Sequence, residues 1–331
     1  MTSNLIQLDP LPAQPRVSIV VPSFNQGRFI GKTIDSILEQ SYHPIEIEVV
    51  DGGSTDETVS VLQSYGAIPE LRWTSEPDRG VADAVNKGFQ RARGDVIGIQ
   101  SSDDWYRPGA VAEAVAALQS AESPALVYAD FVTVDQNGQE LFRSRIGSYS
   151  LERLLSKQTW VPQPSAFFRA AVLPELVGWD ARYFVCDTEF WLRLAFRYPV
   201  QKVDGLWAER RLHETQRNVK AGEIVASYRK MIRDSEDLRA APPQLRRAAR
   251  CGAHLTAMRY NPGGSTWTST WALWRAIAAY PAIFSEVRHL PNLIPGRMTL
   301  ANLRARIGRW KRGEAARELP GTSSSQAVRS T

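Results

Sequence analysis

The chain has 331 residues, 43% of them hydrophobic and 23% charged, with a net charge of +5, an ordinary globular composition with room for one large domain plus an appendage, or for two domains. Its two cysteines, Cys186 and Cys251, argue against a disulfide framework and favour a reducing compartment. The polar, proline-containing segment 1–16 does not resemble a secretory signal, and no uninterrupted apolar run reaches the length of about 18 residues that suggests a membrane-spanning helix.

Short apolar runs rich in β-branched residues alternate with segments whose apolar residues recur at helical spacing. Strands are predicted at 17–21, 45–50, 71–75, 96–99 and 125–129. Helices are predicted at about 29–38, 54–64, 81–94 and 108–119. Ser54 to Glu57 matches a capping box, Pro108 suits a first helical turn, and Asn137-Gly138 is typical of a hairpin. The alternation predicts an α/β fold, with a mostly parallel sheet, helices on both faces and short antiparallel additions.

Acidic residues follow three of the apolar runs. Asp51 comes after the second strand, Asp103 and Asp104 follow the strand at 96–99, and Asp187 and Glu189 follow the run at 183–185. Carboxylates are costly to bury unless they meet a metal, a cation or a ligand. Ligands of open α/β sheets bind outside the carboxyl ends of the strands, so the pattern predicts a metal-assisted site for an anionic substrate.

Two common nucleotide-binding motifs are missing. Residues 23–28, SFNQGR, follow the first strand and lack the G-x-G-x-x-G turn of dinucleotide-binding proteins. No G-x-x-x-x-G-K-[ST] sequence occurs either. An NAD-linked oxidoreductase and a P-loop enzyme therefore lose their main support.

An ordered set of motifs resembles the family-2 inverting glycosyltransferases, which have the GT-A fold. The motifs are VVPSFN at 20–25, VVDGGSTD at 49–56, SEPDRG at 75–80, DAVNKG at 83–88 and QSSDD at 100–104. The resemblance covers about 17–216 and implies a Rossmann-like GT-A domain there, preceded by an N-terminal segment at 1–16. It also implies a nucleotide-sugar donor, with UDP favoured over GDP or dTDP, and Mg²⁺ or Mn²⁺ as cofactor.

The resemblance assigns the donor site residue by residue. It places Pro22, Asn25, Asp51, Asp83 and Asp103 at the nucleotide-sugar, with Asp51 accepting a hydrogen bond from uracil and Asp103 contacting the ribose or a metal-bound water. It makes Asp104 the metal ligand, with His213 near the metal or diphosphate and Arg211 near the phosphates.

Each of these assignments has a structural alternative. Asp51 could cap the following turn, as Ser54 and Asp56 are expected to do, and the acidic pair could belong to a surface turn. Asp83 and Lys87 could form an i,i+4 salt bridge. The family often has Arg where this chain has Val85, which leaves the contacts of that helix open.

The catalytic base of an inverting reaction must take the proton of the acceptor hydroxyl. The segment CDTEFWLR at 186–193 resembles the family segment that carries this base, which makes Asp187 the base and Glu189 its rival. Cys186 stands where the family often has Glu. Both carboxylates could instead simply start a helix, whose dipole favours them. Trp160 and the turn at 163–165 are expected on the acceptor side.

The charge of the chain is unevenly distributed. Residues 246–331 hold 14 Lys or Arg against 3 Glu, whereas 1–245 hold 26 basic and 32 acidic residues. Trp267, Trp271 and Trp274 share one helical face, and Leu300 to Trp310 form a second, Arg-rich amphipathic pattern. We expect a basic helical extension at 217–318 that lies on an anionic membrane surface, or packs on the catalytic domain or a partner subunit, followed by a disordered tail at 319–331.

The favoured function is therefore a metal-dependent inverting glycosyltransferase that is cytoplasmic, on the inner face of the cytoplasmic membrane. It would transfer a sugar to a carbohydrate or lipid-linked acceptor during synthesis of a cell-surface polysaccharide or a lipid-linked oligosaccharide. A nucleotidyltransferase of related fold is one alternative. A nucleic-acid binder acting through the basic tail is another, but the acidic body argues against it, so no nucleic acid is expected. The sequence indicates no oligomeric state.

Overall fold

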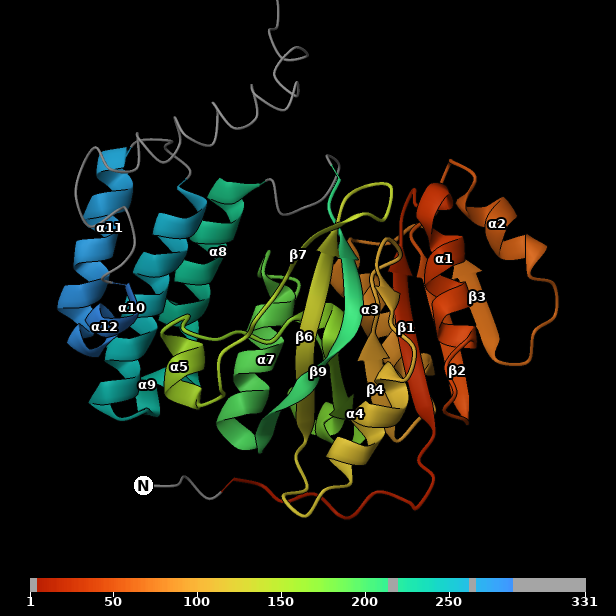
Figure 1. Cartoon of the computed structure of the whole chain (residues 1–331), viewed down its shortest axis with the longest axis horizontal. Helices are drawn as coiled ribbons and strands as arrows, with labels where there is room; N and C mark the ends of the chain where they lie inside the picture. The colour runs from red at the N-terminus through yellow and green to blue at the C-terminus, as the bar shows by residue number, and fades with distance from the viewer. Residues whose placement is uncertain (1–4, 214–219, 262–265, 288–331) are drawn as a thin grey trace, which may run out of the picture.

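The computed structural model describes residues 5–213, 220–261 and 266–287. A nine-stranded sheet forms the body, and helices α8 to α12 stand beside it next to α5 and α7 (Figure 1). Helix α3 packs on β1 and β2, and α4 packs on β6, β8 and β9. The α/β architecture predicted from the sequence is therefore confirmed.

The elements follow one another as a run of β-α units and then a group of helices. The strands are β1 Val17–Ser23, β2 Ile45–Asp51, β3 Leu71–Ser75, β4 Val96–Ile99, β5 Trp105–Tyr106, β6 Leu126–Val134, β7 Glu140–Arg143, β8 Ala166–Arg169 and β9 Val200–Arg211. The helices of the body are α1 Gly27–Leu38, α2 Thr58–Ser64, α3 Val81–Arg91, α4 Ala110–Leu118, α5 Leu151–Leu155, α6 Leu173–Leu176 and α7 Cys186–Arg197, with short 3₁₀ turns η1 Gln163–Ser165 and η2 Ala170–Val172. The later helices are α8 Ala221–Asp234, α9 Glu236–Ala240, α10 Pro243–Tyr260, α11 Thr266–Ala279 and α12 Phe284–Val287, with a 3₁₀ turn η4 Pro281–Ile283 before α12.

The strands lie in the order β3-β2-β1-β4-β8-β6-β9-β5, and β7 pairs with β6 outside this path. Strands β1 to β4 are mutually parallel, as predicted, and β6 is parallel to β9. Strand β8 separates the two groups because it runs antiparallel to both β4 and β6. The predicted fifth strand is thus found as β6, but it does not pair with β4.

Strand β2 carries two buried carboxylates within an otherwise apolar run. Glu46 and Glu48 both pair with Arg72 of the neighbouring β3. Glu46 also accepts hydrogen bonds from Ser18 Oγ and from the backbone N–H of Arg93. Burial raises the pKa of Glu48, and Arg72 opposes this effect. The pair of glutamates is tolerated in the sheet because each has a charged partner.

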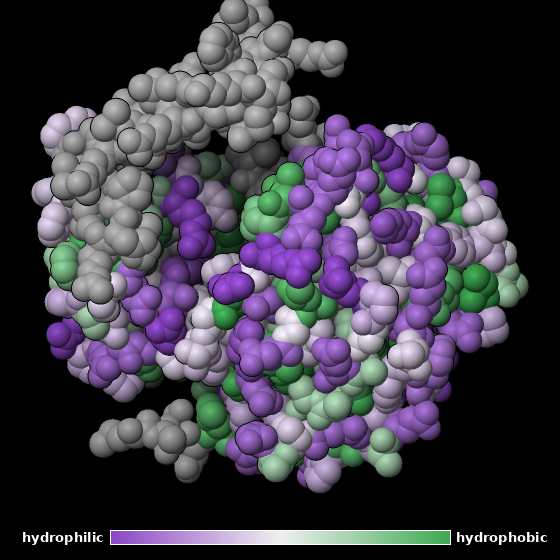
Figure 2. Space-filling view, in the orientation of Figure 1, coloured by the Kyte–Doolittle hydropathy of each residue, from purple (hydrophilic) through white to green (hydrophobic). Residues whose placement is uncertain are grey.

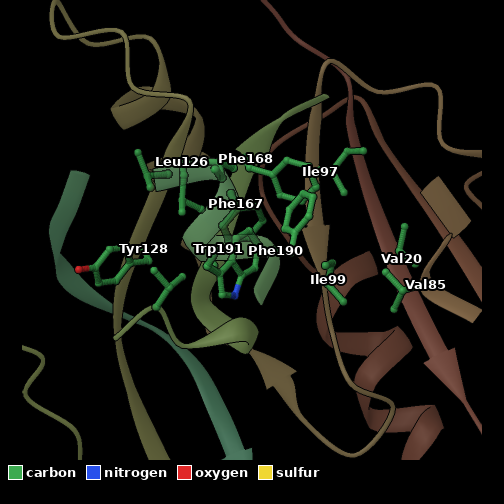
Figure 3. Close-up of a cluster of buried hydrophobic side chains, with 14 of the residues drawn as sticks. Val20, Val85, Ile97, Ile99, Leu126, Tyr128, Phe167, Phe168, Phe190 and Trp191 are labelled. Carbon is green, nitrogen blue, oxygen red and sulfur yellow. The ribbon is translucent and has the colours of Figure 1, made fainter. Parts of the chain in front are cut away.

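Figure 3 shows the part of the largest apolar cluster in which α7 packs on the sheet. Phe190 and Trp191 of α7 contact Phe168 of β8 in edge-to-face geometry, with ring centres 5.4 and 5.7 Å apart. Such aromatic pairs add about 0.5–1.5 kcal/mol each beyond the apolar area they bury. This packing fixes α7 on the sheet and therefore fixes the position of its first turn.

The predicted capping box is wrong. Helix α2 begins at Thr58, not at Ser54, and the side chain of Asp56 accepts from the backbone N–H of Thr58. The hydroxyl of Ser54 donates instead to Asp51, because the loop after β2 needs that contact. Helix α4 likewise begins two residues later than the turn expected at Pro108. The predicted hairpin is confirmed: Asn137 and Gly138 join β6 to β7, and Gly138 has a φ of 86°.

The later helices are held tightly against the body. Helix α10 contacts α5 and α8. A side-chain carbon at Gly252 would come within 2.0 Å of the backbone oxygen of Leu155, so only glycine permits this approach. Among the described residues, no helix has the length and apolar character needed to cross a bilayer. The expected second amphipathic helix and the tail at 319–331 lie outside the described residues.

Candidate active site

The carboxyl ends of the first three strands are in register at one edge of the sheet. Ser23 pairs with Asp51, and Asp51 pairs with Ser75. Pro22 is the penultimate residue of β1, and Asn25 follows in a left-handed conformation with a φ of 53°. The Asn25 backbone N–H donates to Ser54 Oγ at 2.7 Å, and its side-chain oxygen accepts from the Thr55 N–H at 2.9 Å. Asn25 therefore joins the loops that follow β1 and β2.

Asp51 is fully buried and holds its own loop together. Its carboxylate accepts from the backbone N–H groups of Gly53 and Ser54 and from the hydroxyls of Ser54 and Ser75. Three of these donors reach Oδ2, whereas Oδ1, among the described residues, accepts only from Ser54 Oγ. Asp51 thus caps the turn after β2, and its contact with the base of the nucleotide stays a prediction.

Asp83 forms the salt bridge that was its own alternative. Its carboxylate lies 3.0 Å from Arg79 and 3.6 Å from Lys87, and Lys87 also pairs with Glu76 at 3.1 Å. Hydrogen bonds from the Arg79 side chain, and then from its backbone, lower the pKa of Asp83. The group ties the loop after β3 to the first turn of α3.

The two adjacent aspartates after β4 have different surroundings. Asp104 is buried, and its Oδ1 accepts from the backbone N–H of Arg211 at 2.8 Å. Burial first, and then the charge of Asp103, raise the pKa of Asp104. Asp103 keeps part of its side chain accessible, and its Oδ2 lies 2.9 Å from Nε2 of His213. Of the two aspartates, Asp103 is therefore the one whose side chain contacts a histidine, a residue type that can also bind metals.

Arg211, the last residue of β9, locks this loop in place. Its guanidinium carbon lies 4.6 Å from the ring centre of Phe29 and 4.7 Å from that of Trp105. Its nitrogens donate to the backbone oxygens of Asp103 and Gln136. Burial lowers the pKa of this guanidinium, while Asp103 and Asp104 raise it. Two of its donors thus face main-chain oxygens, and the phosphate contact expected from the sequence stays a prediction.

Some residues that support this arrangement were not predicted from the sequence. Phe29 stacks beside His213 with ring centres 5.1 Å apart, and Thr33 donates to the backbone oxygen of Asp104 at 2.7 Å. Trp105 covers Arg211. Because Trp105 directly follows the acidic pair in the sequence, it is the supporting residue that the sequence could have indicated. A cavity of about 510 Å³ lies on the α1 side of Trp105, and none of the predicted site residues lines it.

The two candidate bases, Asp187 and Glu189, differ in their hydrogen-bond partners. Glu189 is buried, and both its oxygens receive hydrogen bonds from Arg193, at 2.6 and 2.8 Å. Asp187 lies in the first turn of α7, partly exposed, without a hydrogen bond or ion pair to the described residues. Of the two, Asp187 is the carboxylate left available to a substrate.

The acceptor-side residues expected from the sequence lie next to the acidic loop and the later helices. Gln163 donates to the backbone oxygen of Ile99 at 2.6 Å and accepts from Ser101 Oγ at 3.1 Å. Trp160 has the guanidinium of Arg259 over its ring at 5.6 Å. Trp160 is thus contacted by a residue of α10.

The structure brings Asp103, Asp104, Arg211 and His213 into one group of contacts, as the sequence predicted. Within the described ranges, no three His, Cys, Asp or Glu side chains converge as a metal-binding group. A cation in this group would therefore need further ligands from a bound substrate or from water.

Comparison with known proteins shows a consistent relationship. Residues 18–173 match the model of the glycosyl transferase family 2. An uncharacterized glycosyltransferase of Mycobacterium tuberculosis is 34% identical over 189 residues, which are 56% of this chain and 71% of that protein. The chondroitin synthase of Escherichia coli is 28% identical over 213 residues, 63% of this chain and 31% of the synthase.

Solved structures share the fold. TarS of S. aureus (residues 1–349), in complex with UDP-GlcNAc, aligns with a TM-score of 0.64 at 16% identity, over 91% of this chain and 93% of that one. A mannosyltransferase of Pyrobaculum calidifontis, in complex with GDP-Man and Mn²⁺, aligns with a TM-score of 0.60 at 22% identity, over 94% and 85%. The predicted GT-A fold is thereby confirmed.

Proposed function

The chain belongs to glycosyl transferase family 2, and from that membership we propose that it moves a sugar from a nucleotide-sugar to an acceptor hydroxyl with inversion at the anomeric carbon. The observation that carries the proposal is the pair formed by Asp103 and His213 at the end of β4 and β9. The pair lies in a loop fixed by Arg211, and the available carboxylate of Asp187 provides the second component.

Asp103 and His213 suit a divalent cation. A carboxylate oxygen and an imidazole nitrogen are ligands for Mn²⁺, and carboxylates also bind Mg²⁺. We assign the metal contact to Asp103 and His213 and give Asp104 a supporting role, because the Asp104 carboxylate is buried against the Arg211 amide. A bound ion would neutralise charge that develops on the leaving nucleoside diphosphate.

The nucleotide would lie over the loops that follow β1, β2 and β3. Pro22, Asn25 and Asp51 shape these loops, and the salt bridges of Asp83 fix the start of α3. We favour UDP as the nucleotide, as the resemblance implies. The buried Asp51 would then support the pocket around the base through the loop that it holds.

Asp187 is proposed to take the proton from the acceptor hydroxyl. Its backbone is held by the aromatic core of α7, so the carboxylate keeps a fixed position when the acceptor binds. A positioned general base contributes about 10²–10⁴-fold to rate.

The acceptor would belong to a cell-surface polysaccharide or a lipid-linked oligosaccharide. The support is the similarity to a chondroitin synthase. We place the reaction at the cytoplasmic face of the membrane, where a nucleotide-sugar donor and a membrane-bound acceptor can meet.

Helix α11 is the proposed membrane contact. Trp267, Trp271 and Trp274 are 69%, 61% and 46% exposed, and the guanidinium of Arg275 lies 5.4 Å from the Trp271 ring centre. Exposed tryptophans beside a cation suit an anionic lipid surface. Replacing the three tryptophans by Ala should weaken co-sedimentation with phosphatidylglycerol-containing vesicles by at least about tenfold.

Leu141 and Phe142 provide the control, because these apolar side chains are 53% and 55% exposed but lie on β7. Their replacement by Ala should leave vesicle binding unchanged. Unaltered binding of the tryptophan variant would count against the membrane proposal. A dimer that dissociates in that variant would instead indicate the alternative, a partner subunit on this face.

The function itself is tested by calorimetry on the full chain. With Mn²⁺ present, UDP should bind more tightly than GDP or dTDP, and chelation of the metal should abolish the difference. In a transfer assay with the matching donor, chelation should lower kcat by about 10²-fold or more, since a metal ion contributes several kcal/mol to the transition state. Release of pyrophosphate in place of a nucleoside diphosphate would indicate the nucleotidyltransferase alternative.

A further inference from the structure

Lys157 is a cation that the proposed reaction does not use. It follows α5 in a left-handed conformation with a φ of 62°, which non-glycine residues rarely adopt. Its ammonium nitrogen lies 4.6 Å from the ring centre of Tyr228, a buried residue of α8. Within the described ranges, no carboxylate hydrogen-bonds to this ammonium, and Asp187 acts on it through its charge alone. The side chain is thus a partly buried cation whose observed contact is an aromatic face.

Two further charges lie within electrostatic reach of Lys157. Burial first, and then the positive charge of Arg259, lower the pKa of its ammonium to about 8, and the negative charge of Asp187 opposes them. Arg259 belongs to the last turn of α10, where its guanidinium covers Trp160. The backbone N–H of Val185, just before α7, donates to Ser227, and Lys157 lies over the ring of the adjacent Tyr228, so Lys157 and the first turn of α7 approach the same part of α8.

Such an arrangement is unfavourable in the absence of a ligand. A desolvated ammonium costs free energy unless it meets an anion, and a second cation nearby adds repulsion. Asp187 is the carboxylate that offsets this cost, but the proposed reaction requires it to receive the acceptor's proton. A further anion between Lys157 and Arg259 would offset the repulsion between the two cations and the cost of burying the ammonium. Asp187 would then remain available to accept the proton.

The packing of α10 on α5 brings together the segments that carry Arg259 and Lys157. Helix α10 is fixed on α5 by the close approach of Gly252 to Leu155, so Arg259 and Lys157 belong to elements that pack on each other. Figure 2 shows a hollow where the later helices meet the body, with hydrophilic side chains on its walls. Through Tyr228 and Arg259, the later helices contact Lys157 and Trp160, and Trp160 is expected on the acceptor side.

We propose that Lys157 and Arg259 form an oxyanion-binding subsite for the acceptor, which would carry a phosphate or carboxylate group near the hydroxyl that receives the sugar. The subsite rests on the proposed function because that function places the acceptor at Asp187. It narrows the acceptor from any carbohydrate to an anionic one. Lys157 acts here by binding, and the proton transfer remains with Asp187.

The test follows Lys157 itself and needs no turnover. In the full chain with ¹³C-labelled lysine, the side-chain resonance that disappears in Lys157→Met should titrate near pH 8. Inorganic phosphate should raise this midpoint by at least one pH unit, because a bound anion favours the charged ammonium. Glucuronate, tested separately, distinguishes a carboxylate from a phosphate: whichever anion raises the midpoint is the preferred class.

Lys230 provides the matched control, because its ammonium also lies over a tyrosine ring, 5.2 Å from that of Tyr183. Its resonance should not move with phosphate. Arg259→Gln should leave the fold unchanged. It should weaken the apparent affinity for phosphate, measured from the shift of the Lys157 midpoint, at least tenfold. A Lys157 midpoint that neither anion moves would overturn the subsite. Because donor binding is measured in a different experiment, this failure would leave the glycosyltransferase proposal intact.

Discussion

Replacing Asp187 by Asn is expected to lower kcat for sugar transfer by about 10²–10⁴-fold, the contribution of a positioned general base. Asparagine keeps the size of the side chain but cannot accept the proton of the hydroxyl. The dissociation constant of the donor should change little, because Asp187 belongs to α7 and takes no part in the contacts that hold the loops after β1, β2 and β3. Initial rates with the donor at saturation, together with calorimetry of donor binding, measure the two quantities separately.

Glu189→Gln is the matched control, two residues away on the same helix. Glu189 forms a two-pronged ion pair with Arg193, which also donates to the backbone oxygens of Leu176 and Gly178. Its replacement should cost about 1–3 kcal/mol of unfolding free energy, seen as a lower Tm, and leave kcat within a few-fold of the parent. If Glu189→Gln removed transfer while Asp187→Asn retained it, the roles of the two carboxylates would be exchanged.

Local pattern was sufficient for most of the parallel sheet. The β-branched runs at 17–21, 45–50, 71–75 and 96–99 predicted β1 to β4, because a strand buried on both faces reads as a continuous apolar run. Strand β8 has only four residues, and nothing in them shows that they separate β4 from β6. Its place is set by packing against strands far away in the sequence.

The start of α2 shows why a local motif can fail. Ser54 and Glu57 have capping-box spacing, but Ser54 is held by Asp51 and by the backbone of Asn25. These contacts join the loops after β1 and β2, which lie about 30 residues apart in sequence. Tertiary contacts thus took the residue that the helix would have used, and Asp56 replaced it.

The sequence predicted which residues lie together in the candidate site better than it predicted what each of them contacts. The sequence brought out Asp103, Asp104, Arg211 and His213, and the structure places them in contact. It could not show which aspartate is buried, because the partner of Asp104 is the backbone of a residue 107 positions later. For the same reason, the sequence could not show that two donors of Arg211 bond to backbone oxygens of residues far away in the chain.

The different roles proposed for Asp103 and Asp104 predict a second large effect, on the binding of the nucleotide with Mn²⁺. Asp103→Asn should weaken Mn²⁺-dependent binding of the nucleotide by more than about 100-fold, since loss of a direct ligand exceeds the 10–100-fold cost of losing an outer contact. Asp104→Asn keeps an oxygen that can accept from the Arg211 amide, so it should remain folded and lose no more than about 10–100-fold. Calorimetry with UDP, with and without Mn²⁺, compares the two variants directly.

Asp104→Leu separates the structural role from the metal contact. It leaves the Arg211 amide without its acceptor in a buried place, which should lower the unfolding free energy by about 1–3 kcal/mol. Asp103→Asn should change that free energy less, because the Asp103 side chain is partly accessible and asparagine can still hydrogen-bond to the His213 ring. The opposite pattern, with Mn²⁺ dependence lost in Asp104→Asn and kept in Asp103→Asn, would return the metal to Asp104. The buried carboxylate would then have to exchange the Arg211 amide for the ion, and the loop between β4 and β5 would have to open for the donor to bind.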